Sequence, residues 1–174
     1  MKAVVRSVLR AGALRLLRIR TIYSPGNIEI LRQGRCIVCA NHVSFLDGVV
    51  LALVSPIPLT FGVDTDFSKR SKLASLGMDV LSWLGFGAVV PVDSGSPFGV
   101  RALLGALNHG RPIMIFPEGA ISKDGGPLPI RPGAAWLVQR AGAEVIHVRI
   151  HGAEKSRFFA KSGQEFWPKI EVHF

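Results

Sequence analysis

Stretches with the pattern of buried β-strands alternate with stretches of helical periodicity along most of this 174-residue chain. Strands are expected at 28–31, 36–40, 59–63, 88–92, 112–116, 145–150 and 170–174, and helices at 46–54, 69–84, 96–109 and 133–141. Such alternation predicts an α/β fold, in which helices flank a mostly parallel, mixed central sheet. Functional sites in these sheets lie at the carboxyl ends of strands.

Length and hydropathy favour one globular domain. A chain of 174 residues is long enough for one sizeable core and short for two. Hydrophobic residues make up 48% of the chain and the mean hydropathy is +0.34, yet no window reaches the roughly 18 uncharged apolar residues of a membrane span. The apolar excess is therefore expected in the core, or in a surface that touches lipid.

The net charge of +9 predicts an anionic partner. Phosphate head groups, an acidic carrier protein and nucleic acid would all meet this charge. Nucleic acid is disfavoured, because aromatic residues are only 8% of the chain and do not alternate with Lys and Arg.

The first twenty residues have the pattern of a basic amphipathic helix. Most of their apolar residues share one broad helical arc, while Lys2, Arg6, Arg10 and Arg20 share another and no acid is present. This pattern is typical of helices that lie in the surface of a bilayer, so we assign residues 1–24 to a membrane-contact segment and 25–174 to the main domain. The alternative is a terminal helix that packs on the domain with its arginines in solvent.

Cys36 and Cys39 form a C-x-x-C pattern inside an expected strand. Side chains three apart on a strand point to opposite faces, which is poor geometry for joint metal ligation. No second Cys/His pair stands at zinc spacing. We therefore interpret both as core residues and expect no metal site.

His42 and Asp47 follow the expected strand 36–40 at a spacing of five residues. Acyl transfer from a thioester to a hydroxyl needs a base, and an imidazole held by a carboxylate supplies one near neutral pH. A spacing of five suits a His in a strand-to-helix loop and an Asp one turn into the helix. The pair alone is also compatible with a loop His and a helix-capping Asp.

A second motif, Phe116-Pro117-Glu118-Gly119, follows the expected strand 112–116. Glu118 would lie at the end of a buried strand, where Gly119 lets a ligand approach the backbone closely. Taken alone, Glu118 is equally compatible with an exposed turn acid.

With both motifs, the chain resembles the glycerolipid acyltransferase superfamily, which includes the 1-acylglycerol-3-phosphate acyltransferases. The family's Asn-His-x4-Asp motif matches Asn41, His42 and Asp47, and its Phe-Pro-Glu-Gly motif matches residues 116–119. Within the family, the chain is most similar to the acyltransferase halves of bifunctional 2-acylglycerophosphoethanolamine acyltransferase/acyl-carrier-protein synthetases, on residues 41–48, 110–119, 133–135 and 148–154.

The resemblance implies roles for individual residues. His42 would be the catalytic base and Asp47 would orient it. The remaining candidates would bind substrate; they are Asn41, Ser44, Phe116, Pro117, Glu118, Gly119, Ser122 and Arg131. The resemblance also implies a lysophospholipid acceptor and an acyl-carrier-protein or acyl-CoA thioester as co-substrate, with no cofactor.

The departures from the family pattern bear on the acceptor. Phosphatidate-forming members usually carry Arg where this chain has Ser94 and Ile121. Loss of bidentate contacts to a terminal phosphate argues for a phosphodiester acceptor such as lysophosphatidylethanolamine. Arg131 precedes a helix start and could still meet a phosphate. A phosphatidate-forming enzyme and a non-catalytic membrane- or carrier-protein-binding module are the competing hypotheses.

Two further expectations concern location and partners. We expect peripheral attachment to the cytoplasmic face of the inner or plasma membrane, from the resemblance and the basic N-terminus. An acidic acyl carrier protein would dock on a basic face formed by Lys69, Arg70, Lys72, Lys155, Arg157 and Lys161.

Overall fold

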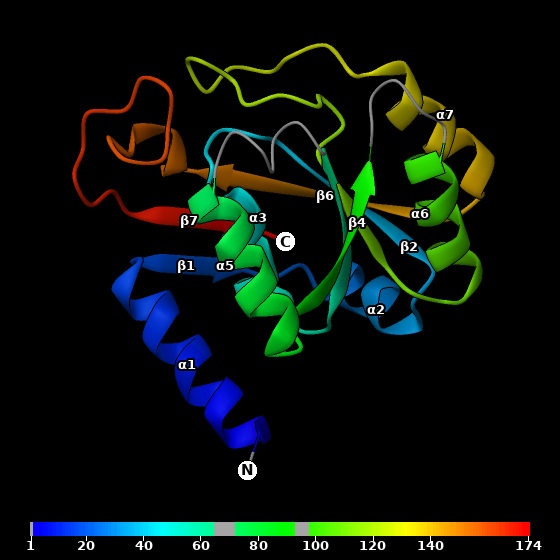
Figure 1. Ribbon diagram of the computed structural model, residues 1–174, viewed down its shortest axis with the longest axis horizontal. Coiled ribbons are helices and arrows are strands. Elements are labelled where there is room, and N and C mark those ends of the chain that lie inside the picture. The colour runs from blue at the N-terminus through cyan, green and yellow to red at the C-terminus, as the bar shows by residue number, and fades with distance from the viewer. Residues whose placement is uncertain (1, 65–71, 93–97) are drawn as a thin grey trace.

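A seven-stranded sheet forms the centre of the molecule in the computed structural model, which describes residues 2–64, 72–92 and 98–174 (Figure 1). The strand order is β1-β7-β6-β2-β5-β3-β4. All neighbouring strands are parallel except β6 and β7, which are antiparallel. The predicted mixed, mostly parallel sheet is therefore confirmed. The strands are β1 (Ile19–Ile22), β2 (Cys36–Ala40), β3 (Leu59–Asp64), β4 (Gly87–Val92), β5 (Ile113–Ile115), β6 (Glu144–His151) and β7 (Ile170–His173).

Helices cover both faces of the sheet (Figure 1). One face packs against α6 (Phe98–Asn108) and α7 (Pro132–Ala141). The other face carries α2 (Pro25–Gln33), α3 (Asp47–Val54) and α5 (Lys72–Trp83), with α1 (Lys2–Leu16) beside α3. A single 3-10 turn, η1 (Ala153–Lys155), follows β6.

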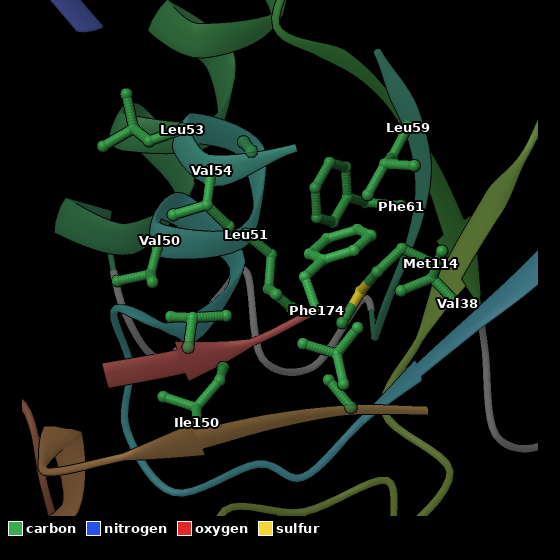
Figure 2. Close-up of a cluster of buried hydrophobic side chains, with 14 of the residues drawn as sticks. Val38, Val50, Leu51, Leu53, Val54, Leu59, Phe61, Met114, Ile150 and Phe174 are labelled. Carbon is green, nitrogen blue, oxygen red and sulfur yellow. The ribbon is translucent and has the colours of Figure 1, made fainter. Parts of the chain in front are cut away.

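Strand β2 separates the two halves of the core. Its residues alternate between the α3 side, where Val38 packs with Leu51 and Phe174, and the α6–α7 side (Figure 2). Cys36 lies on the first side and Cys39 on the second, and both thiols are free and buried. Burial raises the pKa of each thiol to about 11, so both remain protonated near neutral pH. The interpretation of these cysteines as core residues is confirmed.

The predicted strand 28–31 is wrong, because these residues lie inside α2. Pro25 occupies the first turn of that helix after Ser24, and the Ile28 N–H donates to the Ser24 carbonyl at 3.1 Å. Pro at this position favours a helix start, and Gly34 ends the helix at φ 72°. The apolar residues Ile28, Ile30 and Leu31 had suggested a strand, but Pro25 in the first turn and Gly34 after the last turn favour a helix.

The N-terminal helix is shorter than its charge pattern indicates. It ends at Leu16, and Arg18 reverses the chain at φ 53°. Residues 19–22, which the sequence analysis placed in the membrane-contact segment, form β1 and pair with β7. Residues 19–22 are too few to give a clear strand pattern next to the helical pattern that precedes them.

The apolar arc of α1 faces away from the domain. Arg6 donates to the Gly85 carbonyl at 3.2 Å, and Arg10 donates to the Val54 carbonyl at 2.9 Å. The arc on the other side is exposed and consists of Val4, Val5, Val8, Leu9 and Leu16. The helix also packs Ala13 and Leu14 against the core while Arg6 and Arg15 stay exposed, as the alternative of a terminal helix on the domain expects, so membrane contact stays a prediction. None of the helices in residues 2–64, 72–92 and 98–174 has the length and apolar character to cross a bilayer.

Three sequence features fall outside the described residues: the expected helix start at Ser96 and Pro97, Ser94, and the Lys69-Arg70 pair. Trp83, Trp136 and Trp167 are all largely exposed, at 85%, 47% and 47%, so none is a core residue.

Candidate active site

The loop between β2 and α3 brings His42 and Asp47 together. His42 follows the last residue of β2, and Asp47 is the first residue of α3. The Nδ1 atom of His42 lies 2.9 Å from Oδ2 of Asp47, and both side chains are buried. An ionised carboxylate only accepts hydrogen bonds, so Nδ1 is the ring nitrogen that donates to it. In the neutral imidazole, Nε2 then carries the lone pair that can accept a proton.

Asp47 is held by more than its histidine partner. Its Oδ2 accepts the backbone N–H groups of Val43 at 2.6 Å and Ser44 at 2.8 Å, and its Oδ1 accepts the Ser44 hydroxyl at 2.6 Å. These donors compensate for the desolvation of a fully buried carboxylate. They also fix the carboxylate, and through it the plane of the imidazole.

The second motif lies directly against the first. Because β2 and β5 are parallel neighbours, their carboxyl ends meet at one edge of the sheet. The Phe116 ring stacks on the His42 ring with centroids 3.9 Å apart and an angle of 10° between planes. Phe116 therefore forms one wall of the imidazole site.

Asn41 and Ser122 fix the backbone around His42. The Asn41 amide donates to the Ile150 carbonyl at 2.9 Å and accepts the Ile150 N–H at 2.8 Å, so it extends the pairing of β2 with β6. The Ser122 N–H donates to the His42 carbonyl at 2.8 Å. Both were predicted to bind substrate; these contacts give them a positioning role in the described structure.

Glu118 and Gly119 form a tight turn over the site. The Gly119 N–H donates to the Phe116 carbonyl at 3.0 Å, and Gly119 has φ 62°. Oε2 of Glu118 is buried without a hydrogen-bond partner among the described residues. Such an oxygen is available to a ligand hydroxyl or other donor.

Arg131 returns to this turn from the far end of the loop 117–132. Its N–H donates to the Pro117 carbonyl at 2.8 Å, and a Cβ on Gly119 would lie 2.9 Å from the Arg131 Cγ. The exposed Arg131 side chain therefore stands beside Glu118 and Gly119 at the start of α7.

An apolar groove next to Ser44 had no counterpart in the sequence analysis. The groove is shallow: about 20 Å³ of it admits the centre of a water-sized sphere, and its empty volume of about 340 Å³ includes open solvent. Its walls come from the end of α1, the His42–Asp47 loop, the turn after β6 and the segment before β7. The lining residues are Leu17, Ser44, Leu46, Ala153, Ser156, Phe159, Phe166, Trp167, Pro168 and Ile170. The cluster of aromatics at 158–167 was the available signal, but only folding brings it to residues 17 and 44.

A buried imidazole–carboxylate pair next to an apolar groove can remove a proton from a hydroxyl held by an apolar substrate. No three His, Cys, Asp or Glu side chains in the described parts of the chain are placed to hold a metal ion.

Comparison with known proteins agrees with this geometry. A family model described as Acyltransferase matches residues 23–151, which is most of the chain and includes both motifs. The chain belongs to the acyltransferase family. Within that family, it is 28% identical over 125 residues to the 1-acyl-sn-glycerol-3-phosphate acyltransferase BAT2 (chloroplastic) of Brassica napus, a match that covers 69% of this chain and 34% of that protein.

The acyltransferase fold is also found in a solved structure. The crystal structure of the 1-acyl-sn-glycerophosphate (LPA) acyltransferase PlsC from Thermotoga maritima superposes with a TM-score of 0.60 at 18% identity, covering 99% of this chain and 70% of that one. This likeness concerns the fold. The chain spans about a third of the length of the Brassica napus relative.

Proposed function

We propose that this acyltransferase moves a fatty acyl chain from a thioester to the free hydroxyl of a lysophospholipid, with His42 as general base and Asp47 as its orienter. The observation that carries the proposal is the buried His42–Asp47 pair at the edge of the sheet where Phe116 and Glu118 also lie. The four hydrogen bonds that fix the carboxylate behind the imidazole support a catalytic role over a non-catalytic binding module.

The proposed reaction takes place in a ternary complex. The acceptor oxygen attacks the thioester carbonyl carbon while Nε2 of His42 takes the hydroxyl proton. The C–S bond then breaks, and the leaving thiolate takes that proton from the imidazolium, which Asp47 stabilises until then. The products are an ester and a thiol, and no acyl-enzyme forms.

The apolar groove is the proposed binding site of an acyl chain. Its Ser44 end touches the Asp47 carboxylate, and its other end is bordered by Phe166 and Trp167, which are partly exposed. A chain lying there would bring its reacting end to His42. Burial of each methylene in such a groove favours binding by about 0.8 kcal/mol.

Lysophosphatidylethanolamine is the proposed acceptor, in line with the resemblance to the bifunctional ethanolamine-lipid enzymes. The Ile121 side chain is buried where phosphatidate-forming members carry Arg. Lys161 supplies one positive charge near this point, because its Nζ donates to the Ile121 carbonyl at 2.6 Å. A single lysine suits the one negative charge of a phosphodiester better than the two of a terminal phosphate. Lysophosphatidate is the competing acceptor, favoured by the names of the two similar proteins.

Membrane attachment through α1 is also proposed, on the cytoplasmic face. The exposed valines and leucines of this helix point away from the domain, and Leu17, directly after the helix, lines the groove. The donor is proposed to be acyl carrier protein or acyl-CoA. Lys155, Arg157 and Lys161 are exposed beside the groove and would attract either acidic donor.

The test is acyl transfer by the purified chain, with lysophosphatidylethanolamine and lysophosphatidate competing for an acyl-carrier-protein donor. We expect preference for the ethanolamine lipid, and a loss of at least about a hundredfold in kcat for His42→Ala. His109→Ala is the matched control, because His109 is exposed at the end of α6. Preference for lysophosphatidate would be consistent with the proposed acyl transfer but would contradict lysophosphatidylethanolamine as the acceptor. Near-normal turnover by His42→Ala would reject the base assignment.

A further inference from the structure

Glu154 is a half-buried acid that the proposed mechanism does not use. It lies in η1, directly after β6, at the same edge of the sheet as His42 and Glu118. Its Oε2 is buried without a hydrogen-bond partner among the described residues. A buried carboxylate oxygen is costly to leave unpaired, so a ligand that supplies a donor is the natural explanation.

The loop that carries Glu118 also covers Glu154. A Cβ on Gly125 would lie 3.0 Å from the Glu154 Cγ, so this side chain packs directly under the loop 117–132. The same loop donates from the Ser122 N–H to the His42 carbonyl. Since Ser122 and Gly125 are three residues apart, at most roughly 11 Å of chain separates the two contacts. A phosphoethanolamine head group attached to a glycerol held at His42 has a comparable reach.

Two nearby cations, Arg157 and Lys161, have other contacts in the structure. Arg157 stacks on Phe166, with its guanidinium carbon 4.9 Å from the ring centroid. Lys161 donates to the Ile121 carbonyl on the other side of the loop. No salt bridge to Glu154 occurs within residues 2–64, 72–92 and 98–174.

We propose that Glu154 binds the ammonium group of the ethanolamine head group and so determines acceptor specificity. The inference rests on the proposed acyl transfer to a lysophospholipid. A primary ammonium carries three N–H donors and a positive charge, so it satisfies Oε2 and neutralises the carboxylate. Choline offers no N–H donor, and lysophosphatidate brings a second negative charge that Glu154 repels. Glu154 therefore discriminates against both.

The neighbours of Glu154 support this assignment. Ala153 and Ser156, on either side of it, line the groove next to Ser44. Consider an acceptor with its glycerol at His42 and its acyl chain in the groove. Its head group would then lie beside the turn that contains Glu154. Lys161 donates to the Ile121 carbonyl of the same loop and would supply a positive charge to the intervening phosphodiester.

Glu154→Gln is the test, because it keeps the shape of the side chain and removes its charge. Glu144→Gln is the matched control, since Glu144 is exposed at the opposite end of β6. The acceptors are lysophosphatidylethanolamine and lysophosphatidylglycerol, which share the phosphodiester and differ in the ammonium. We expect kcat/KM for the ethanolamine lipid to fall at least about tenfold relative to that for the glycerol lipid, mainly through KM. Equal losses with both acceptors, or no loss, would overturn the proposal.

Two measurements separate this proposal from the acyl transfer itself. Glycerophosphoethanolamine and glycerophosphoglycerol, titrated into the protein by NMR, test head-group recognition without turnover. We expect tighter binding of the ethanolamine compound by the wild-type chain and by Glu144→Gln, and equal binding of both by Glu154→Gln. Thermal unfolding gives the second measurement. Glu154→Gln should unfold at the same or a higher temperature, because it removes a half-buried charge that has no salt-bridge partner among the described residues; a clear decrease would indicate a structural role and contradict the proposal.

Discussion

At the scale of single residues, Asp47 has two functions that share one set of contacts. Four donors surround its carboxylate, and three of them come from residues 43 and 44 of the same loop. The carboxylate therefore shapes the loop as well as orienting His42. Loss of the charge should disturb catalysis more than loss of any one donor, because every donor points at the same two oxygens.

Asp47→Asn tests the orienting role of the carboxylate. The amide has one oxygen for four donors, and its NH2 group would face either His42 or the loop backbone. We expect kcat to fall at least about a hundredfold, because the imidazole loses the partner that fixes its protonated nitrogen. Steady-state kinetics gives the rate, and circular dichroism reports folding. Asp79→Asn, at an exposed position of α5, should retain full activity. A small effect of Asp47→Asn on kcat would show that orientation is not needed.

Ser44→Ala removes a single donor from Asp47. The hydroxyl donates to Oδ1 at 2.6 Å, and a buried hydrogen bond to a charged group contributes about 1.5–3 kcal/mol. We expect the free energy of unfolding to decrease by about that amount, with a smaller loss of kcat than for Asp47→Asn. Urea unfolding measures the first quantity. If Ser44→Ala reduced kcat as much as Asp47→Asn without loss of stability, Ser44 would itself take part in the reaction.

At the scale of elements, the site depends on two parallel strands that end side by side. The sequence predicted β2 and β5 and placed both motifs at their ends, because continuous apolar runs are a strong local signal. The helix α2 and the strand β1 were missed for opposite reasons. Pro25 in the first turn of α2 favours a helix over the strand that Ile28, Ile30 and Leu31 had suggested. Strand β1 exists through its pairing with β7, about 150 residues away. The groove and the contacts of Asn41 depend on equally distant partners.

The thiols on β2 give a prediction about pH. Burial raises the pKa of Cys36 and Cys39 from 9.0 to about 11 in the folded protein. The folded state therefore binds protons more tightly than the unfolded state between these values, so stability falls as the pH rises above 9. We expect urea midpoints measured between pH 8 and 10.5 to decline less for Cys36→Ala/Cys39→Ala than for the wild type. Parallel declines would show that the thiols ionise equally in both states.

At the scale of the whole molecule, the orientation of α1 decides which surface is left apolar. Arg6 and Arg10 bond to carbonyls of the domain, so the side of the helix with Val4, Val5 and Val8 is turned outward. Figure 1 shows this helix projecting from the body of the molecule. Exposed aliphatic residues on a basic helix are suited to an anionic bilayer surface.

Val8→Asp tests this surface. Val8 is 65% exposed, so the substitution should leave the fold intact while it places a negative charge in the apolar arc. We expect binding to vesicles that contain anionic lipid to weaken about tenfold, measured by co-sedimentation. Ser7→Asp adds the same charge outside the arc and is the control. Equal binding by the two variants would place the membrane contact elsewhere.

The join between α1 and the groove has a kinetic consequence. The Trp167 indole donates to the Leu16 carbonyl at 2.6 Å, and the Arg18 guanidinium donates to the Trp167 carbonyl at 2.9 Å. These two hydrogen bonds connect α1 to the groove wall at Trp167. If α1 binds the membrane as proposed, the opening of the groove would therefore lie at the lipid surface. A lysolipid could then enter by lateral diffusion, without first dissolving in water. Turnover would follow the mole fraction of lysolipid in the bilayer, and dilution with inert phospholipid would slow it at constant bulk concentration.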